Sequence, residues 1–178
     1  MKGESGMKRR TIRKWFWVWE FDEEEKWFND MAKRGWVLDS VGFAKYTFIE
    51  CEPGEYAVRL EMLDHTPASS EGQDYIDFIE ETGAEYLGNV MKWIYFRKKT
   101  ADGKFDLFSD IDSRIRHMER IVKPLGIIAL SNLLIGVGNL RFGGLGLINV
   151  ACAALLGYAC HKINQKKTAL QKERSLHE

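Results

Sequence analysis

The stretch that decides the fold runs from Pro124 to Cys160 and reads PLGIIALSNLLIGVGNLRFGGLGLINVACAALLGYAC. Its 37 residues carry one charge, Arg141, which lies inside the Gly-rich break Arg141–Gly144. Each flanking apolar run has 16 residues, which gives a helix of roughly 24 Å. Neighbouring apolar residues extend both runs toward a hydrocarbon core of about 30 Å. Neither run has the polar face of a soluble helix, so we predict a transmembrane hairpin at 124–161. A buried helical pair in a soluble core is the alternative.

Basic residues flank the hairpin on both sides. They are Arg114, Arg116, Arg120 and Lys123 before it, and Lys162, Lys166, Lys167, Lys172 and Arg174 after it. Lys and Arg accumulate on the cytoplasmic side of membranes. We therefore expect a two-span protein of the cell membrane with both termini in the cytoplasm, and a basic cytoplasmic tail at 162–178 that lies near membrane lipid.

Composition excludes several classes of protein. The chain has 26 basic and 26 acidic residues, and residues 124–178 hold six basic against two acidic. Residues 1–123 are therefore net acidic, which argues against a nucleic-acid partner. Three cysteines without a Cys-x-x-Cys pair argue against a disulfide framework and the usual zinc sites, and they suit a reducing compartment.

Residues 11–98 are expected to form one soluble domain, after a disordered N-terminus at 1–10. Aromatic residues at Lys14–Phe21 predict a strand. Glu23–Arg34 predicts a helix that Asp22 caps and Gly35 ends. The other expected elements are strands at 36–43, 45–50, 55–63, 84–90 and 91–98 and a helix at 70–82.

A shift of 48 residues superposes the two halves of this domain. It places Gly35 on Gly83, Trp27 on Tyr75, Phe28 on Ile76, Met31 on Ile79, Leu38 on Tyr86 and Phe48 on Phe96. Both halves read strand–helix–strand–strand, which indicates an internal duplication. The predicted fold is α+β, with a duplicated antiparallel sheet of about six strands and its helices on one face. An amphipathic connecting helix at 105–123 and the hairpin follow.

The aromatic strand leaves one sheet face to be covered. Strand alternation would place Trp15, Trp17 and Trp19 on one side, with Trp17 buried and Trp15 exposed. The cover is left open between a ligand, a partner subunit, the 105–123 helix and the bilayer surface. That helix could equally pair with a second copy of the chain.

Sequence motifs of catalysis are missing, so we expect no enzyme, no cofactor and no metal site. A small-molecule site is the remaining candidate, because concave, aromatic-lined surfaces with few charges bind such ligands. Its expected residues are Trp15, Trp17, Trp19, Glu20, Trp36, Glu61 and Trp93. Carboxylates beside indoles would favour a cationic or amphipathic ligand. The alternative is that these tryptophans belong to the core or the membrane interface. The acidic run Glu23–Glu25 reads as a favourable first helical turn.

Small residues in the hairpin predict close helix packing. The expected contact positions are Gly136, Gly138, Ala153 and Gly157.

Residues 13–36 read RKWFWVWEFDEEEKWFNDMAKRGW. With Tyr46–Phe48 they resemble a family of small bacterial membrane proteins that carries a domain of unknown function. The family pattern is an aromatic strand, a helix ending in Met-Ala-x-x-Gly-Trp, and a strand leading to Tyr-x-Phe. The resemblance implies no catalytic residues. It implies genes beside PadR-type transcriptional regulators, and hence stress- or drug-responsive roles.

We therefore expect a non-enzymatic, membrane-anchored sensor or adaptor that binds a protein partner, a second copy or an amphipathic small molecule. The alternative is an accessory subunit of a membrane transporter complex whose hairpin makes the contacts.

Overall fold

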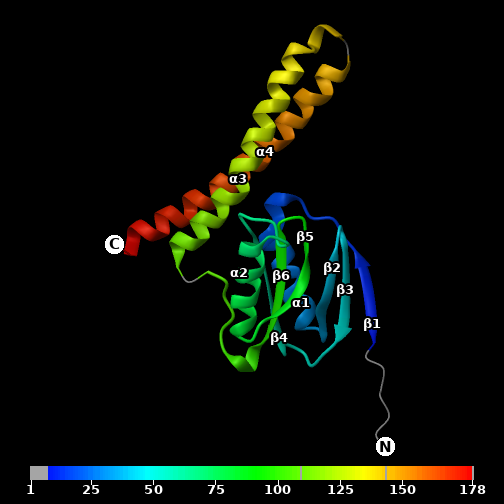
Figure 1. The fold of residues 1–178 in the computed structure, drawn as a ribbon, viewed down its shortest axis with the longest axis vertical. Helices are drawn as coiled ribbons and strands as arrows, with labels where there is room; N and C mark the ends of the chain where they lie inside the picture. Colours follow the sequence, from blue (N-terminus) through cyan, green and yellow to red (C-terminus); the bar gives the residue numbers. More distant parts are fainter. Residues whose placement is uncertain (1–7, 109, 143, 178) are drawn as a thin grey trace, which may run out of the picture. The chain divides into compact units, whose positions relative to one another are not determined.

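The structure is a computed structural model that describes residues 8–108, 110–142 and 144–177 (Figure 1). Residues 1–7 of the expected disordered N-terminus lie outside the described residues, as do Gly143 in the hairpin turn and the last residue of the tail. The chain divides into two compact units, Met1–Leu107 and Phe108–Glu178. The first unit is α+β and the second is a helical hairpin, which confirms the predicted fold class.

The first unit contains six strands, two helices and two short 3-10 turns among its described residues. In chain order they are β1 Arg9–Arg13, η1 Val18–Glu20, α1 Phe21–Ala32, β2 Trp36–Gly42, β3 Lys45–Glu50, β4 Tyr56–Met62, α2 Ser70–Glu81, β5 Glu85–Val90, β6 Trp93–Lys99 and η2 Thr100–Asp102. Both halves follow the predicted order of strand, helix, strand and strand.

Hydrogen bonds join the strands into two antiparallel sheets of three, ordered β1-β3-β2 and β4-β6-β5. Each helix packs on one face of the sheet of its own half: Phe28 of α1 contacts Phe48 of β3, and α2 packs on β5 and β6. The expectation of about six strands in one sheet is not met. Instead, Arg97 of β6 donates to the carbonyl of Leu38 at 2.9 Å, so a side chain joins the two sheets at this point.

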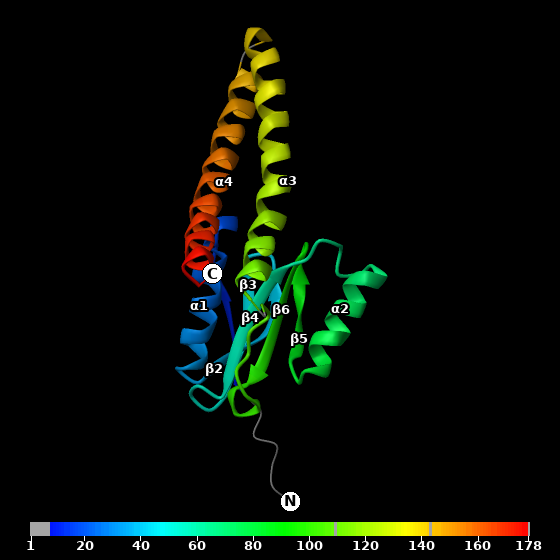
Figure 2. The same ribbon diagram turned by 90° about the vertical axis from the view of Figure 1, so that its left-hand side faces the viewer.

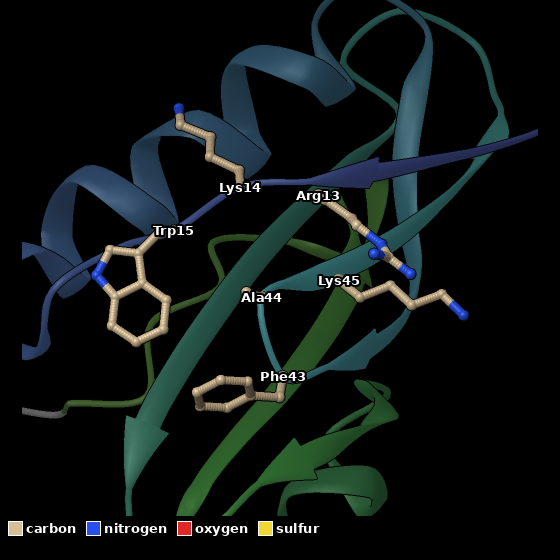
Figure 3. A pocket seen from close by; sticks show the side chains of 6 residues that line it. All are labelled: Arg13, Lys14, Trp15, Phe43, Ala44 and Lys45. Carbon is tan, nitrogen blue, oxygen red and sulfur yellow. The ribbon is translucent and has the colours of Figure 1, made fainter.

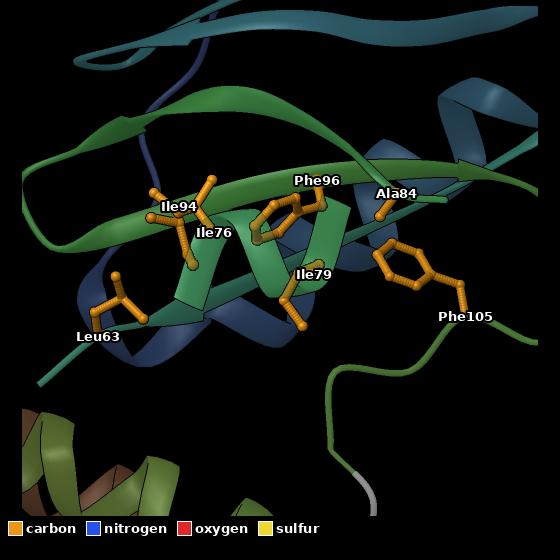
Figure 4. Packing of buried hydrophobic residues seen from close by; sticks show 7 residues of the cluster. All are labelled: Leu63, Ile76, Ile79, Ala84, Ile94, Phe96 and Phe105. Atoms are coloured by element: carbon orange, nitrogen blue, oxygen red, sulfur yellow. The ribbon is translucent and has the colours of Figure 1, made fainter. Parts of the chain in front are cut away.

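Helix α1 covers the second face of the second sheet. Successive residues of β6 point to opposite faces. Ile94 and Phe96 pack with Ile76 and Ile79 of α2, together with Leu63, Ala84 and Phe105 (Figure 4). Tyr95 points the other way and contacts Phe28 of α1, with ring centroids 6.0 Å apart. The sequence left open what covers the second face of the sheet. For the β4-β6-β5 sheet, helix α1 of the same domain covers it.

The expected strand at Lys14–Phe21 is wrong. The first strand lies earlier, at Arg9–Arg13, and pairs with β3 alone. Because the carboxylate of Glu20 accepts from the amide of Trp17 at 2.9 Å, the aromatic segment turns there and enters α1. Aromatic residues have high strand propensity, but propensity reflects packing on a pleated surface more than a backbone preference.

The two hairpins share their irregularities at the same spacing of 48 residues. Gly35 and Gly83 both follow a helix with left-handed φ of 83° and 86°, a conformation that favours glycine. The register shifts between Leu38 and Ser40 in the first hairpin and between Tyr86 and Gly88 in the second. A β-bulge thus occupies the equivalent position in both halves.

The second unit consists of α3 Ile111–Gly138, the 3-10 turn η3 Leu140–Phe142 and α4 Gly144–His177, and the two long helices lie side by side (Figure 2). Helix α3 runs without a break through Pro124, so the expected connecting helix and the first apolar helix of the hairpin are one element. It begins at Ile111 instead of 105, because Asp110 caps it by accepting from the amide of Ser113 at 2.6 Å. Phe105 belongs to the core of the first unit.

Candidate functional site

A cavity of about 230 Å³ opens in the first unit where three connecting segments meet. They are residues 15–18, the β2–β3 turn and the β5–β6 turn. The backbone amide of Lys14 donates to the carbonyl of Ala44 at 3.2 Å, which ties the first segment to the β2–β3 turn. Both halves of the domain therefore contribute to one cavity, which we call the aromatic pocket.

Aromatic side chains dominate the lining of this pocket. Eight of its fourteen lining residues are aromatic: Trp15, Phe16, Trp17, Phe21, Phe43, Tyr46, Trp93 and Tyr95. Neighbouring rings contact one another, with centroids 5.7 Å apart for Trp15 and Trp17 and 5.6 Å apart for Phe21 and Trp93. Such edge-on and tilted contacts fix the orientation of the rings.

The floor of the pocket carries a carboxylate. Glu24 of α1 is buried, and its Oε1 accepts from the hydroxyl of Tyr46 at 2.8 Å and from that of Tyr95 at 3.2 Å. Burial raises the pKa of Glu24 above its ordinary value, although both hydrogen bonds oppose this shift. Burial and the neighbouring Glu24 likewise raise the pKa values of Tyr46 and Tyr95. Both tyrosines therefore remain protonated donors at physiological pH.

The rim of the pocket is apolar and exposed. Phe43 and Met91, at the two hairpin turns, are 72% and 81% exposed, and Trp15 and Trp17 are 53% and 41% exposed. Clusters of exposed apolar side chains mark binding surfaces more often than isolated ones do. Each turn also contains a residue with positive φ, Ala44 or Met91, and such backbone conformations are uncommon outside glycine.

A shallower depression adjoins the rim (Figure 3). It shares Trp15, Phe43 and Ala44 with the aromatic pocket and adds Arg13, Lys14 and Lys45. In Figure 3 the side chains of Arg13 and Lys45 point away from the two rings. The positive charges of Arg13 and Lys45 therefore lie outside the pocket, on β1 and β3.

The structure brings three of the seven expected ligand residues to the pocket: Trp15, Trp17 and Trp93. Trp19 stacks on Trp17 with centroids 5.0 Å apart, and Glu20 closes the local turn. Trp36 begins β2. Glu61 lies on the face of its sheet that α2 covers, away from the pocket. Its carboxylate there accepts from the hydroxyl of Tyr75 of α2 at 2.6 Å.

Two predictions about the tryptophans are wrong because residues 14–17 do not form a strand. The segment is not a strand, so strand alternation does not order Trp15, Trp17 and Trp19. Trp15 is exposed as predicted, whereas Trp17, expected in the core, is 41% exposed. Both lie at the rim of the pocket.

Sequence reasoning missed Glu24, Tyr46 and Tyr95. A signal for Glu24 was present, because Glu24, Phe28 and Met31 follow the i, i+4, i+7 spacing of one helix face, and all three are buried. Glu24 was instead interpreted as one of the acidic residues that favour the first turn of the helix. Among the described residues, no group of three His, Cys, Asp or Glu is placed to hold a metal ion.

In the helical hairpin, two of the four expected packing positions lie at the helix contact. A Cβ at Gly136 would lie 2.9 Å from the amide nitrogen of Val150, and Ala153 is buried. A Cβ at Gly138 or Gly157 would meet no atom within 4 Å. Gly146, which was not predicted, also lies at the helix crossing. A Cβ at Gly146 would lie 2.8 Å from the carbonyl oxygen of Gly136.

Two helices, Ile111–Gly138 and Gly144–Ser175, are long and apolar enough to cross a membrane. Most of their large apolar side chains are exposed, for example Ile127, Leu134 and Leu147 at 68%, 65% and 62%. Exposed apolar surface of this kind needs a cover.

Fold and site together define a class of protein: an α+β domain with a carboxylate-floored aromatic pocket, in one chain with a hairpin of two membrane-length apolar helices. Comparison with known families gives a match over residues 20–130 to the family described as "Protein of unknown function (DUF2812)". The chain belongs to this family. The match covers α1, α2, strands β2 to β6 and the first part of α3. No match was found among curated proteins or among solved structures.

Proposed function

We propose that the chain is a non-enzymatic sensor or adaptor anchored in the membrane by α3 and α4. Its first unit would receive a small amphipathic molecule in the aromatic pocket and pass that event to a protein partner. The observation that carries this proposal is the pocket itself. An apolar, aromatic cavity with a single buried carboxylate and an exposed apolar rim has the makeup of a small-molecule site.

The membrane anchor is supported by the two apolar helices and by their flanks. A soluble hairpin would leave exposed leucine and isoleucine side chains along both helices in water. Basic residues precede α3's apolar part and follow that of α4, so the positive-inside rule favours cytoplasmic termini. The sensor unit would then lie in the cytoplasm.

The hydrogen bonding of the pocket's polar groups favours ligand binding over catalysis. The hydroxyls of Tyr46 and Tyr95 both donate to Glu24, an arrangement that orients a carboxylate. A nucleophile with its own general base, the usual mark of covalent catalysis, is not found among the described lining residues.

A thermal-shift screen of full-length protein in nanodiscs tests this proposal. Amphipathic compounds that raise the melting temperature of the wild type should not raise that of Trp17→Ala, which removes a rim side chain. Trp36→Ala is the matched control, because Trp36 does not line the pocket. Equal shifts in both variants would place binding elsewhere.

A second candidate is an accessory subunit of a transporter complex. Gly138 and Gly157 lie away from the partner helix, and small residues on exposed faces of membrane helices favour contacts with other helices. In that case Gly157→Leu should abolish co-purification of a membrane partner or a second copy in mild detergent, and Trp17→Ala should leave it intact.

The resemblance to bacterial membrane proteins encoded beside PadR-type regulators supports a drug- or stress-responsive role. The neighbouring genes of this chain test that link. Induction of the chain by an amphipathic drug, lost when an adjacent regulator gene is deleted, would support it.

A further inference from the structure

The aromatic pocket contains one charge and no described counter-charge. Glu24 is the one charged side chain among its fourteen lining residues. Among the described residues, no Lys or Arg forms an ion pair with it. A buried carboxylate normally has a partner, because burial of an unpaired charge is costly.

The two oxygens of Glu24 differ in their surroundings. Oε1 accepts both tyrosine hydroxyls, whereas no hydrogen bond from a described residue reaches Oε2. Glu24 lines the cavity. One oxygen is therefore held by the protein and the other is available to a ligand.

Several basic side chains of the same unit contact groups other than Glu24. The ammonium of Lys14 lies 4.5 Å from the ring centroids of both Phe16 and Trp27. Arg13 and Lys45 line the adjoining depression instead of the pocket. Arg97 is held by Glu85 at 2.8 Å.

We propose that the pocket receives the positively charged group of a small organic cation, with Glu24 as its counter-ion and the aromatic rings as its walls. This inference rests on the proposed function and names the chemical class of its ligand. Tyr46 and Tyr95 act as positioning residues that hold the carboxylate toward the cavity.

Aromatic rings and a carboxylate both favour a cation over a neutral or anionic ligand. Ring faces attract ammonium groups most strongly where water is excluded. An anion would meet Glu24 with no basic lining residue to offset it. The cavity of about 230 Å³ exceeds the roughly 30 Å³ share of one water several-fold, so it has room for a substituted ammonium group.

Choline and its uncharged isostere 3,3-dimethyl-1-butanol are suitable probes. Both dissolve in water and differ by one charge. Full-length protein in nanodiscs free of phosphatidylcholine is titrated with each, and tryptophan emission is recorded, since three pocket residues are tryptophans. We expect choline to bind about tenfold or more tightly than the alcohol, as a desolvated cation–π contact and a counter-ion predict.

Glu24→Gln should bring the two affinities together, and Glu23→Gln, an exposed control on the same helix that does not line the pocket, should leave the preference unchanged. Equal affinities in the wild type would overturn the inference and leave the proposed small-molecule site standing. Binding of neither probe would overturn both. A preference that survives in Glu24→Gln would also contradict the role of Glu24.

A pH titration of the wild type keeps the test independent of whether Glu24→Gln folds. Choline affinity should fall as pH is lowered and Glu24 becomes protonated, while affinity for the alcohol stays constant. The other titratable groups that line the pocket are Tyr46 and Tyr95. Both stay protonated as the pH is lowered, so they do not contribute to the change in affinity. A pH-independent choline affinity would contradict the inference.

A lipid headgroup and a free metabolite could both supply a substituted ammonium group. Repeating the titration in phosphatidylcholine nanodiscs separates them. Loss of the choline response there identifies the headgroup as the source, and an unchanged response identifies a free cation.

Discussion

The hydroxyl of Tyr46 lies 2.8 Å from Oε1 of Glu24, a buried hydrogen bond between β3 and α1. Removing it should leave the carboxylate with one donor. We predict that Tyr46→Phe lowers the free energy of unfolding by about 1–3 kcal/mol, the cost of an under-satisfied buried polar group. Urea unfolding followed by tryptophan emission measures this, because all six tryptophans lie in the first unit.

Tyr86→Phe is the control for that change. The Tyr86 hydroxyl donates to Asn89 at 3.0 Å in an exposed position, so its loss should change stability by no more than about 0.5 kcal/mol. Equal effects of the two substitutions would show that the Glu24 hydrogen bond contributes little.

Glu25 makes the stability of the first unit depend on pH. Burial raises its pKa to about 7, although Arg59, 3.5 Å away, opposes the shift. Between pH 4.5, its ordinary value, and about 7, the folded state binds more protons than the unfolded chain. Stability should therefore fall as pH rises through this window, and burial of Glu24 acts in the same direction.

Urea midpoints measured across that range check this prediction. Glu25→Gln should reduce the slope, whereas Glu23→Gln at an exposed position should preserve it. A stability that rises with pH through the window would mean that the ion pair with Arg59 outweighs burial.

The helix crossing should be sensitive at Gly136 and insensitive at Gly157. A side chain at Gly136 would press on Val150, whereas one at Gly157 meets no atom within 4 Å. We predict that Gly136→Val separates α3 from α4 and lowers the thermal stability of the hairpin, measured by far-UV circular dichroism in detergent. Gly157→Val should keep the wild-type value, and the reverse order would place the contact on the other face.

Membrane topology is the fourth prediction. A reporter fused after Glu178 should read cytoplasmic, and one inserted in the Arg141–Gly144 turn should read external, because basic residues flank the hairpin at its other end. Alkaline carbonate should leave the protein in the membrane fraction. Release by carbonate or high salt would contradict a spanning hairpin.

The sequence predicted the regular elements where local and tertiary signals agree. Gly35 and Gly83 end helices with the left-handed conformation that glycine favours, and the strands after them were predicted to within about two residues. The membrane-length helices were equally plain, because apolar character over this length depends on little else.

The predictions failed where tertiary contacts, and not local sequence, determine the secondary structure. Strand β1 reads RRTIR, and only Ile12 is partly buried, so an edge strand of this kind shows no apolar alternation. The aromatic segment after it was mistaken for a strand because its side chains pack in a pocket instead of a sheet. Whether the six strands hydrogen-bond into one sheet or two depends on long-range pairing, which the local sequence pattern does not reveal.

The pocket could be predicted only in part for the same reason. Trp15 and Trp17 were apparent as aromatic residues, but Tyr46 and Tyr95 come from separate strands of the two halves. Only the fold brings their hydroxyls to the one carboxylate.

Fluorine NMR of full-length protein labelled with 5-fluorotryptophan tests most directly that the aromatic pocket binds the ligand. Choline should shift the signals of Trp15, Trp17 and Trp93, which line the pocket, and leave that of Trp36 unchanged. Each signal is assigned by a single Trp→Phe substitution. A shift at Trp36 alone, or no shift in any of the four signals, would contradict the account.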